Sequence, residues 1–368
     1  MAPELYRPIY LLIVTILTYF VCRRYYDWGS EDVVVEEVAA EREHKLQIRY
    51  ASLLAIFMTL FIGLRPIRGH FVDMYNYKVN YMALYYGKSF KFSWDTDNYL
   101  FDNLTLWLGS NQIDLVYFFL FMAILYFGLM YWACRKMFPN DTLLSFLVYL
   151  AAFSTFSYGT NGIKAGAAAS MFLVALAYRE NWKIAALFCF LSLGFHHSML
   201  VPIVAFVLAS FSRTPSNYLL IWLLCLFLAA IHVTDFMVFF SGFTDERGAH
   251  YLVDDVENAA LYVSGFRPDF ILYSAVPIFL GYYYIQNQKI ESDTYNYLWC
   301  TYTLTNSVFL LCTYGHFINR IAYLSWLMYP FVLIYPVLYG DSGVNQQRYL
   351  KYAVYGHLGF TLFNNLFL

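Results

Sequence analysis

The chain has few charged residues. Only 13% of its 368 residues are Asp, Glu, Lys or Arg, whereas 60% are hydrophobic and 21% are aromatic. A soluble chain usually carries about 25% charged residues. Because the deficit extends along the whole sequence, it argues against a soluble domain and favours a polytopic membrane protein. Lipid offers no partner to stray backbone groups, so we expect an all-α bundle of transmembrane helices.

Several other features are absent. The formal net charge is −2, so no basic excess indicates a nucleic-acid partner. The six cysteines lie in or at the ends of apolar runs and form no CxxC pair, which excludes a disulfide framework and a zinc knuckle. Neither an internal repeat nor a low-complexity segment is present. We therefore expect one transmembrane helical domain over residues 1–368.

The apolar runs predict about twelve spans, since a transmembrane helix needs roughly 17–25 residues. These runs are Tyr6–Cys22, Ile48–Leu64, Ile113–Cys134, Thr142–Tyr158, Gly162–Tyr178, Ile184–Phe195, Met199–Phe211, Tyr218–Val233, Phe270–Ile285, Tyr295–Thr313, Ile318–Tyr339 and Tyr352–Leu368. The two runs that meet at His196-His197 are the shortest. They represent one long helix, two short helices or a broken helix that lines a cavity, and this choice sets the sidedness of everything that follows.

Twelve spans with the N-terminus outside leave an inner loop at 23–49 and two long outer segments at 65–112 and 234–269. Basic residues are then in weak excess on the inside, as expected for a membrane protein. Part of the first outer segment, YMALYYGKSFKFSW, is aromatic and half-polar. Such a composition suits a helix that lies in the membrane interface.

Five cations lie at helix ends on the predicted outer face. Charges at membrane depth are costly and tend to be functional, and guanidinium groups bind phosphate in a bidentate manner. We therefore predict a site for a diphosphate and its substrate; the alternatives are snorkelling to the headgroups and, for the last two arginines, stabilisation of helix ends. The predicted binding residues are Arg65, Arg68, Lys164, Arg267, Arg320, Asn161, Asn319 and Tyr77.

Three residues are candidates for proton transfer. Asp73 would deprotonate or orient a sugar hydroxyl, unless it serves as an ion-pair partner of the nearby arginines or as a helix N-cap. His196 and His197 offer a base, hydrogen-bond donors or half of a metal site. Adjacent helical residues point about 100° apart, so a shared ion is disfavoured. We favour one histidine lining the site and the other packing in the core.

One acidic patch is the candidate metal site. Asp254, Asp255 and Glu257 lie in the second outer segment and suit Ca²⁺ or Mg²⁺, although a solvated loop surface is the favoured interpretation. We predict no cofactor and leave a divalent cation open.

Three motifs resemble one family. GLRPIRGHFVDMYNY, Gly63 to Tyr77, resembles the GLRP…G…D…Y signature after the second helix of the EpsG family. NGIK, which begins at Asn161, resembles the family's N-x-x-R segment, and FHHSM, which begins at Phe195, resembles its F-H-x-S element. Order and spacing agree as far as Pro202. The chain departs from the family at Lys164-Ala165, where arginine and glutamine are usual, and at Met74, which replaces a threonine.

The resemblance implies a function. EpsG proteins are similar to Wzy-type polymerases of O-antigen, lipopolysaccharide and exopolysaccharide, with a fold like that of C-type membrane glycosyltransferases. A growing glycan on undecaprenyl diphosphate would be the donor, and a repeat unit on the same lipid the acceptor. Asp73 occupies the place of the acidic residue that the first outer loop of such enzymes carries. The enzyme would lie in the bacterial inner membrane with its active site facing the periplasm or cell exterior, and its pathway partners would be a flippase and a chain-length regulator.

Three rival functions stay open on the sequence. An O-antigen ligase uses the same donor and leaving group. A lipid-linked sugar flippase or transporter predicts inverted repeats and paired broken helices, which we do not find. A membrane O-acyltransferase would use a histidine base but needs a thioester donor from the inner face, whereas the predicted cations gather outside.

Overall fold

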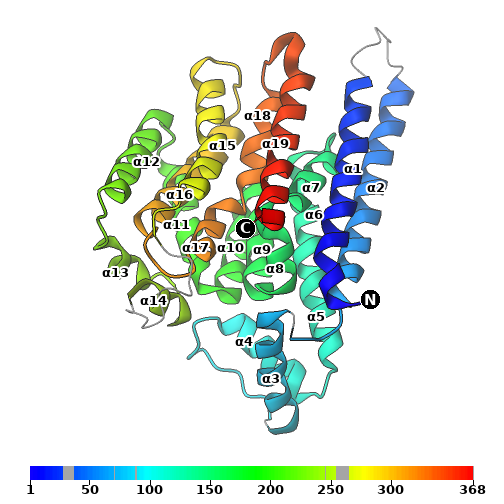
Figure 1. Cartoon of the computed structure of the whole chain (residues 1–368), viewed down its shortest axis with the longest axis vertical. Helices are drawn as coiled ribbons and strands as arrows, with labels where there is room; N and C mark the ends of the chain where they lie inside the picture. The colour runs from blue at the N-terminus through cyan, green and yellow to red at the C-terminus, as the bar shows by residue number, and fades with distance from the viewer. Residues whose placement is uncertain (28–36, 70, 88, 245, 254–264, 368) are drawn as a thin grey trace. The chain divides into compact units, whose positions relative to one another are not determined.

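The computed structural model describes residues 1–27, 37–69, 71–87, 89–244, 246–253 and 265–367 (Figure 1). The protein is 80% helical, and the described residues form no strand, so the all-α prediction is confirmed. The chain divides into two compact units. Unit 1 comprises Met1–His196 with Lys351–Leu368, and unit 2 comprises His197–Leu350.

Unit 1 is built on the long helices at the two ends of the sequence. Its helices are η1 (Pro3–Leu5), α1 (Tyr6–Asp27), α2 (Glu37–Gly63), α3 (Val72–Gly87), α4 (Tyr99–Ser110), α5 (Leu115–Ala123), η2 (Ile124–Gly128), α6 (Leu129–Met137), α7 (Thr142–Leu150), α8 (Phe153–Thr160), α9 (Ile163–Ala177), α10 (Trp182–Phe195) and most of α19 (Gln346–Phe367). Helix α19 returns to α7, where the His357 ring lies 3.1 Å from the Val148 carbonyl and the Thr361 hydroxyl donates to the Ala151 carbonyl.

The helix from Leu115 to Met137 contains one wide turn. Residues Ile124–Gly128 form a π-helical segment between α5 and α6. A π turn leaves a carbonyl to be satisfied from outside the helix. Here the Ser170 hydroxyl of α9 donates to the Tyr126 carbonyl at 2.8 Å. The wide turn therefore fixes α9 against this helix.

The predicted span Thr142–Tyr158 is not straight. It divides into α7 and α8, which are bent by 74° at Ala151-Ala152. At the break, the Tyr149 carbonyl accepts from the Ala152 N–H at 3.1 Å and from the Thr155 hydroxyl at 2.6 Å. The bend places the end of α8 beside the end of α2.

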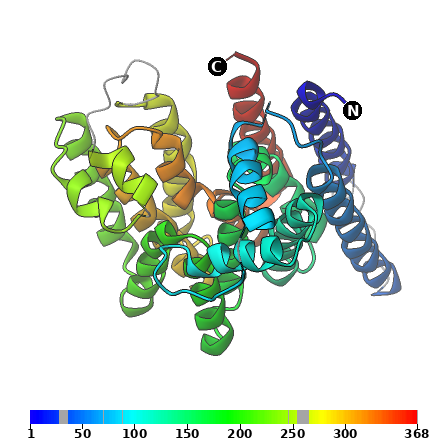
Figure 2. The same ribbon diagram turned by 90° about the horizontal axis from the view of Figure 1, so that it is seen from below.

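Helices α3 and α4 lie at the end of unit 1 where α2 ends (Figures 1 and 2). Both fall in the predicted outer segment 65–112. The sequence predicts an interfacial helix over residues 81–94. Only the first part of this range is helical, since helix α3 ends at Gly87 and residues 89–98 are not helical. The buried side chain of Asn103 in α4 accepts a hydrogen bond from the Ser93 N–H and donates one to the Ser93 carbonyl. These two bonds hold the backbone of the loop in a non-helical conformation.

Unit 2 has a core of buried polar bonds and aromatic rings. The Trp222 indole donates to the Asn306 amide oxygen at 2.8 Å, and the Asn306 amide donates to the Ser325 hydroxyl at 2.9 Å, which joins three helices. The helices of unit 2 are η3 (His197–Met199), α11 (Leu200–Phe211), α12 (Pro215–Ala230), α13 (Phe236–Ser241), α14 (Glu246–Val253), α15 (Pro268–Gln286), α16 (Asp293–Leu311), α17 (Ile318–Trp326), α18 (Tyr329–Tyr339) and η5 (Gly343–Asn345).

Four helices in the described ranges are long and apolar enough to cross a membrane. They are Pro3–Arg23, Glu41–Gly63, Leu115–Met137 and Ile318–Tyr339, with α7 and α8 a fifth if the bent pair counts as one span. The predicted count of about twelve is not confirmed, because several apolar runs form helices shorter than a straight span requires. The shorter apolar helices include α9, α10, α11 and α12. Of the alternatives left open at His196-His197, one long helix is excluded, since α10 ends at Phe195 and α11 begins at Leu200.

Candidate functional site

Arg65 is the most buried of the predicted cations, with 3% of its surface exposed. It lies just beyond the end of α2. One terminal nitrogen donates to the Ile62 carbonyl at 2.8 Å, and the other donates to the Thr160 carbonyl at 2.6 Å. The rings of Phe71 and Phe119 lie 5.5 and 5.1 Å from the guanidinium carbon. Arg65 thus caps the C-terminal ends of α2 and α8, where helix dipoles favour a cation.

The charge of Arg65 has no carboxylate partner among the described residues. Burial away from water lowers the pKa of its guanidinium to about 9. Its Nε is buried without a hydrogen-bond partner in the described part of the chain, and so is the Oδ1 of Asn161, the residue after Thr160. A buried polar group without a partner costs about 1–3 kcal/mol. A donor and an acceptor are therefore left unsatisfied in the interior of this corner.

The rest of the first motif is more accessible. Arg68 is exposed, in the short connection between α2 and α3. Asp73 is half-buried in the first turn of α3, where a carboxylate is stabilised by the helix dipole. The structure thus gives the motif one buried arginine, one exposed arginine and a carboxylate at a helix N-terminus.

Phe101 of α4 is the centre of a second cluster. The Lys164 ammonium, at the start of α9, lies 6.0 Å from the Phe101 ring. The rings of Tyr77 and Phe195 lie 6.0 and 6.2 Å from it. His196 follows Phe195 and caps the end of α10 through its backbone N–H, which donates to the Ser192 carbonyl. Phe101 thus brings parts of α3, α9 and α10 together.

The two clusters are joined through a tight contact between α8 and α9. A Cβ built on Gly166 would lie 2.9 Å from the Tyr158 carbonyl, so only glycine permits this approach. Asn161 lies on the turn between the two helices, and Lys164 lies in the first turn of α9. In unit 1 the structure therefore brings residues of all three motifs to the end where α2 terminates.

Arg267 belongs to unit 2 and is paired with a carboxylate. It is the N-cap of α15, and its Nε and one terminal nitrogen donate to the two oxygens of Asp269 at 2.8 and 2.5 Å. Its guanidinium carbon lies 4.1 Å from the centre of the Phe270 ring. The hydrogen bond from Arg267 lowers the pKa of the Asp269 carboxyl.

The remaining predicted residues also lie in unit 2. His197 begins η3, and Asn319 and Arg320 occupy the first turn of α17. Arg320 is exposed and lies 5.1 Å from the ring of Phe317, whose φ of 51° is left-handed. Arg267 precedes α15 and Arg320 lies in α17. These two helices pack on each other, since the Phe270 ring of α15 lies 5.0 Å from the Trp326 ring of α17.

The acidic patch Asp254, Asp255 and Glu257 lies outside the described residues. Among the residues that are described, no group of three His, Cys, Asp or Glu side chains could hold a metal ion.

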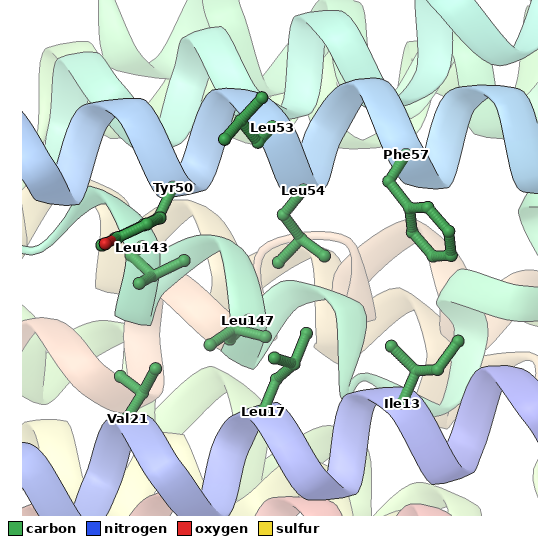
Figure 3. Close-up of a pocket in the computed structure, with 9 residues that line it drawn as sticks. All are labelled: Ile13, Leu17, Val21, Tyr50, Leu53, Leu54, Phe57, Leu143 and Leu147. Atoms are coloured by element: carbon green, nitrogen blue, oxygen red, sulfur yellow. The ribbon is translucent and has the colours of Figure 1, made fainter.

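An apolar groove of about 440 Å³ lies between α1, α2 and α7 (Figure 3). Among the side chains drawn, the Tyr50 hydroxyl is the only polar atom. Its lining comprises Ile13, Leu17, Val21, Tyr50, Leu53, Leu54, Phe57, Leu143 and Leu147. Such a lining suits hydrocarbon rather than sugar. The Phe57 end of the groove is the nearer to Arg65 along α2.

Sequence reasoning missed three parts of these clusters. Thr160 contributes only a backbone carbonyl, which no sequence pattern reveals. Phe101 lies in a helix that was assigned to an outer segment. Asp269 stands two residues after Arg267, and that spacing was a signal that the arginine has a local partner.

Comparison with known proteins gives one match. The model of the family described as the EpsG family matches residues 48–367, a range that includes all three motifs, all of unit 2 and unit 1 except for residues 1–47 and residue 368. No curated protein and no solved structure matches the chain.

Proposed function

The chain belongs to the EpsG family, and from that membership we propose that it polymerises lipid-linked oligosaccharide repeat units at the outer face of the bacterial inner membrane. The known kind of member is a Wzy-like polymerase, and the family is generally of the glycosyltransferase type. The observation that carries the proposal is the convergence of the three motifs at one end of unit 1, where Arg65 bonds to Thr160 and Lys164 approaches Phe101.

The proposed reaction transfers a glycan between two lipid carriers. The terminal hydroxyl of a repeat unit on undecaprenyl diphosphate attacks the anomeric carbon of the growing chain. A new glycosidic bond forms as the bond from that carbon to the donor diphosphate breaks, and the electron pair leaves with the diphosphate. The hydroxyl proton passes to a base of the protein.

Cations would stabilise the negative charge that develops on the leaving diphosphate. Arg68 is exposed three residues after Arg65 and offers a fork of donors, which bonds to no other side chain of the described residues, while Lys164 adds an ammonium group. Arg65 is less suited to direct binding, because it is buried and two of its five N–H donors already bond to carbonyls. The proposal therefore assigns direct diphosphate binding chiefly to Arg68 and Lys164, whereas a role for Arg267 and Arg320 of unit 2 stays a prediction from the sequence.

Asp73 and the histidine pair are the proposed bases. Asp73 lies at the start of α3, and His196 lies at the end of α10 beside the Phe101 cluster. Either side chain would accept the proton of the attacking hydroxyl. The apolar groove beside α2 suits the polyprenyl tail of a carrier whose head lies near Arg65.

A purified-enzyme assay tests the proposal. Incubation with a lipid-diphosphate repeat unit alone should yield a ladder of longer glycans on a gel. Because no lipid A core is present, a ligase would yield no ladder, and a flippase would form no covalent product. We expect pathway partners, a flippase and a chain-length regulator, to be unnecessary for this reaction.

Arg68→Ala should slow ladder formation about 100-fold, the size of effect that loss of one charge-stabilising group produces. The matched control is Arg42→Ala, which removes another exposed arginine, near the start of α2. Both proteins should purify in the same yield. An unchanged ladder with Arg68→Ala would contradict direct diphosphate binding by this residue, and no ladder from the unaltered protein would contradict the polymerase proposal.

A further inference from the structure

Exposed aromatic side chains follow the non-helical segment 89–98 and continue onto its neighbours. Trp94 is 65% exposed and Phe92 is 43% exposed. Ring centroids are separated by 5.0 Å from Phe92 to Trp94, 5.1 Å from Trp94 to Tyr99 and 5.7 Å from Tyr99 to Phe190 of α10. We call these four residues the aromatic platform.

The platform rests on a fixed loop. The side chain of Asn103, which is 7% exposed, accepts from the Ser93 N–H at 2.9 Å. The Asn103 amide donates to the Ser93 and Tyr99 carbonyls, each at 2.6 Å. One buried amide therefore holds the backbone on both sides of Trp94 and presents its ring in a set position.

The inner end of the platform meets the candidate site. A Cβ built on Gly194 would lie 2.6 Å from the Leu100 side chain and 2.9 Å from the Tyr99 ring. The start of α4 thus packs directly on α10, two residues before His196. The next ring along α4, Phe101, is the one that Lys164 and Phe195 approach. Phe101 lies two residues after Tyr99 and so on another side of α4, which means that the platform ends beside the proposed place of reaction.

The polar groups beside the platform favour a sugar over a lipid surface. Asp95 and Asp97 are exposed on the loop together with Lys91. Aromatic faces pack on the apolar faces of pyranose rings, and carboxylates accept hydrogen bonds from hydroxyl groups. An interfacial belt of aromatic residues also forms at membrane surfaces, but anionic headgroups repel carboxylates at that depth.

We propose that the aromatic platform is a glycan subsite that holds pyranose rings of the oligosaccharide and guides its end toward the His196 and Lys164 corner. This inference rests on the proposed function for the identity of its ligand. The subsite contacts only the sugar part of the lipid-linked oligosaccharide, so it should also bind an oligosaccharide that carries neither lipid nor diphosphate.

The test is a titration with the repeat-unit oligosaccharide of the producing bacterium, released from its lipid by mild acid. Binding to the full-length protein in lipid nanodiscs is measured by calorimetry. Trp94→Ala should weaken binding about tenfold, because it removes the most exposed ring. The matched control is Trp182→Ala, which removes a 71% exposed tryptophan at the other end of α10 and should leave the affinity unchanged. Equal affinities of the two variants would overturn the subsite.

A second measurement separates the glycan subsite from a membrane anchor. The fluorescence of Trp94 is the difference between the spectra of the unaltered protein and Trp94→Ala, recorded in nanodiscs with and without brominated lipids. Aqueous iodide should quench this emission, and added oligosaccharide should protect it. Quenching by brominated lipid would instead show that Trp94 lies in the bilayer and would overturn the proposal.

Failure of the subsite and failure of the polymerase proposal give different results. In one case the unaltered protein forms no glycan ladder and yet binds the oligosaccharide more tightly than Trp94→Ala does. That result would contradict the polymerase reaction alone. A ladder formed normally by Trp94→Ala, together with unchanged sugar affinity, would contradict the subsite alone.

Discussion

At the scale of single residues, Arg65 shows that one side chain can serve both the fold and the site. Its two terminal nitrogens bond to carbonyls at the ends of α2 and α8, and its buried Nε has no hydrogen-bond partner among the described residues. The sequence indicated a functional arginine because charge is costly at this depth. It did not show that Arg65 is tied to two carbonyls, since one of them lies 95 residues away. Direct binding of diphosphate by Arg65 stays a prediction.

Arg65→Lys tests the capping role. One ammonium group does not reproduce the fork that reaches two separate carbonyls. We expect a loss of about 2 kcal/mol of stability, within the range of a charge-assisted hydrogen bond, measured as a lower midpoint of thermal unfolding in detergent. The control Arg68→Ala removes an exposed side chain and should leave the midpoint unchanged. Equal midpoints for Arg65→Lys and the unaltered protein would rule out the cap.

At the scale of secondary-structure elements, small residues decide how closely α9 approaches its neighbours. The sequence predicted close packing from the run Ala165–Ser170. The structure confirms it at Gly166, where the Tyr158 carbonyl occupies the space of a side chain. The interruption at His196-His197 was also predictable, because polar residues interrupt an apolar run there. The bend at Ala151-Ala152 was not, because two alanines in an apolar run carry no signal that a helix ends.

Gly166→Ala should separate α8 from α9 and destabilise the protein by about 1–3 kcal/mol, since an overpacked contact with backbone atoms does not relax easily. Gly128→Ala is the matched control. It lies in the adjoining helix segment, and nothing stands within 4 Å of the Cβ it would add. Thermal unfolding should show a lower midpoint for Gly166→Ala only. An unchanged unfolding midpoint for Gly166→Ala would mean that α8 and α9 can separate without any loss of stability, which would contradict the prediction.

At the scale of the whole molecule, the sequence was enough to predict the fold class but not the number of membrane spans. Composition alone indicated an all-α membrane protein. The count depended on treating every apolar run as a straight span, whereas α9 to α12 are short and α7 turns sharply into α8. Sidedness depends on that count, so the common outer face of the cations remains a prediction from the sequence.

Labelling of introduced cysteines tests that face. The native cysteines suit the experiment, because five are buried and Cys189 is half-buried. Single replacements Arg68→Cys and Arg320→Cys should react with a membrane-impermeant maleimide in intact cells, since both positions are exposed. Arg49→Cys, on the predicted inner side, should react only after the cells are opened. Reaction of positions 68 and 320 from opposite sides would contradict a shared diphosphate site.

The pairing of Arg267 with Asp269 affects which anions this arginine would accept. A carboxylate two residues away is tethered at a high effective concentration, so it competes with any ion that approaches the same nitrogens. Chloride or a single phosphate from solution would rarely replace it. A ligand held by several other contacts at once, such as a lipid anchored in the bilayer, would have the advantage needed to displace it. The Asp269 carboxylate would therefore disfavour the binding of small anions to Arg267.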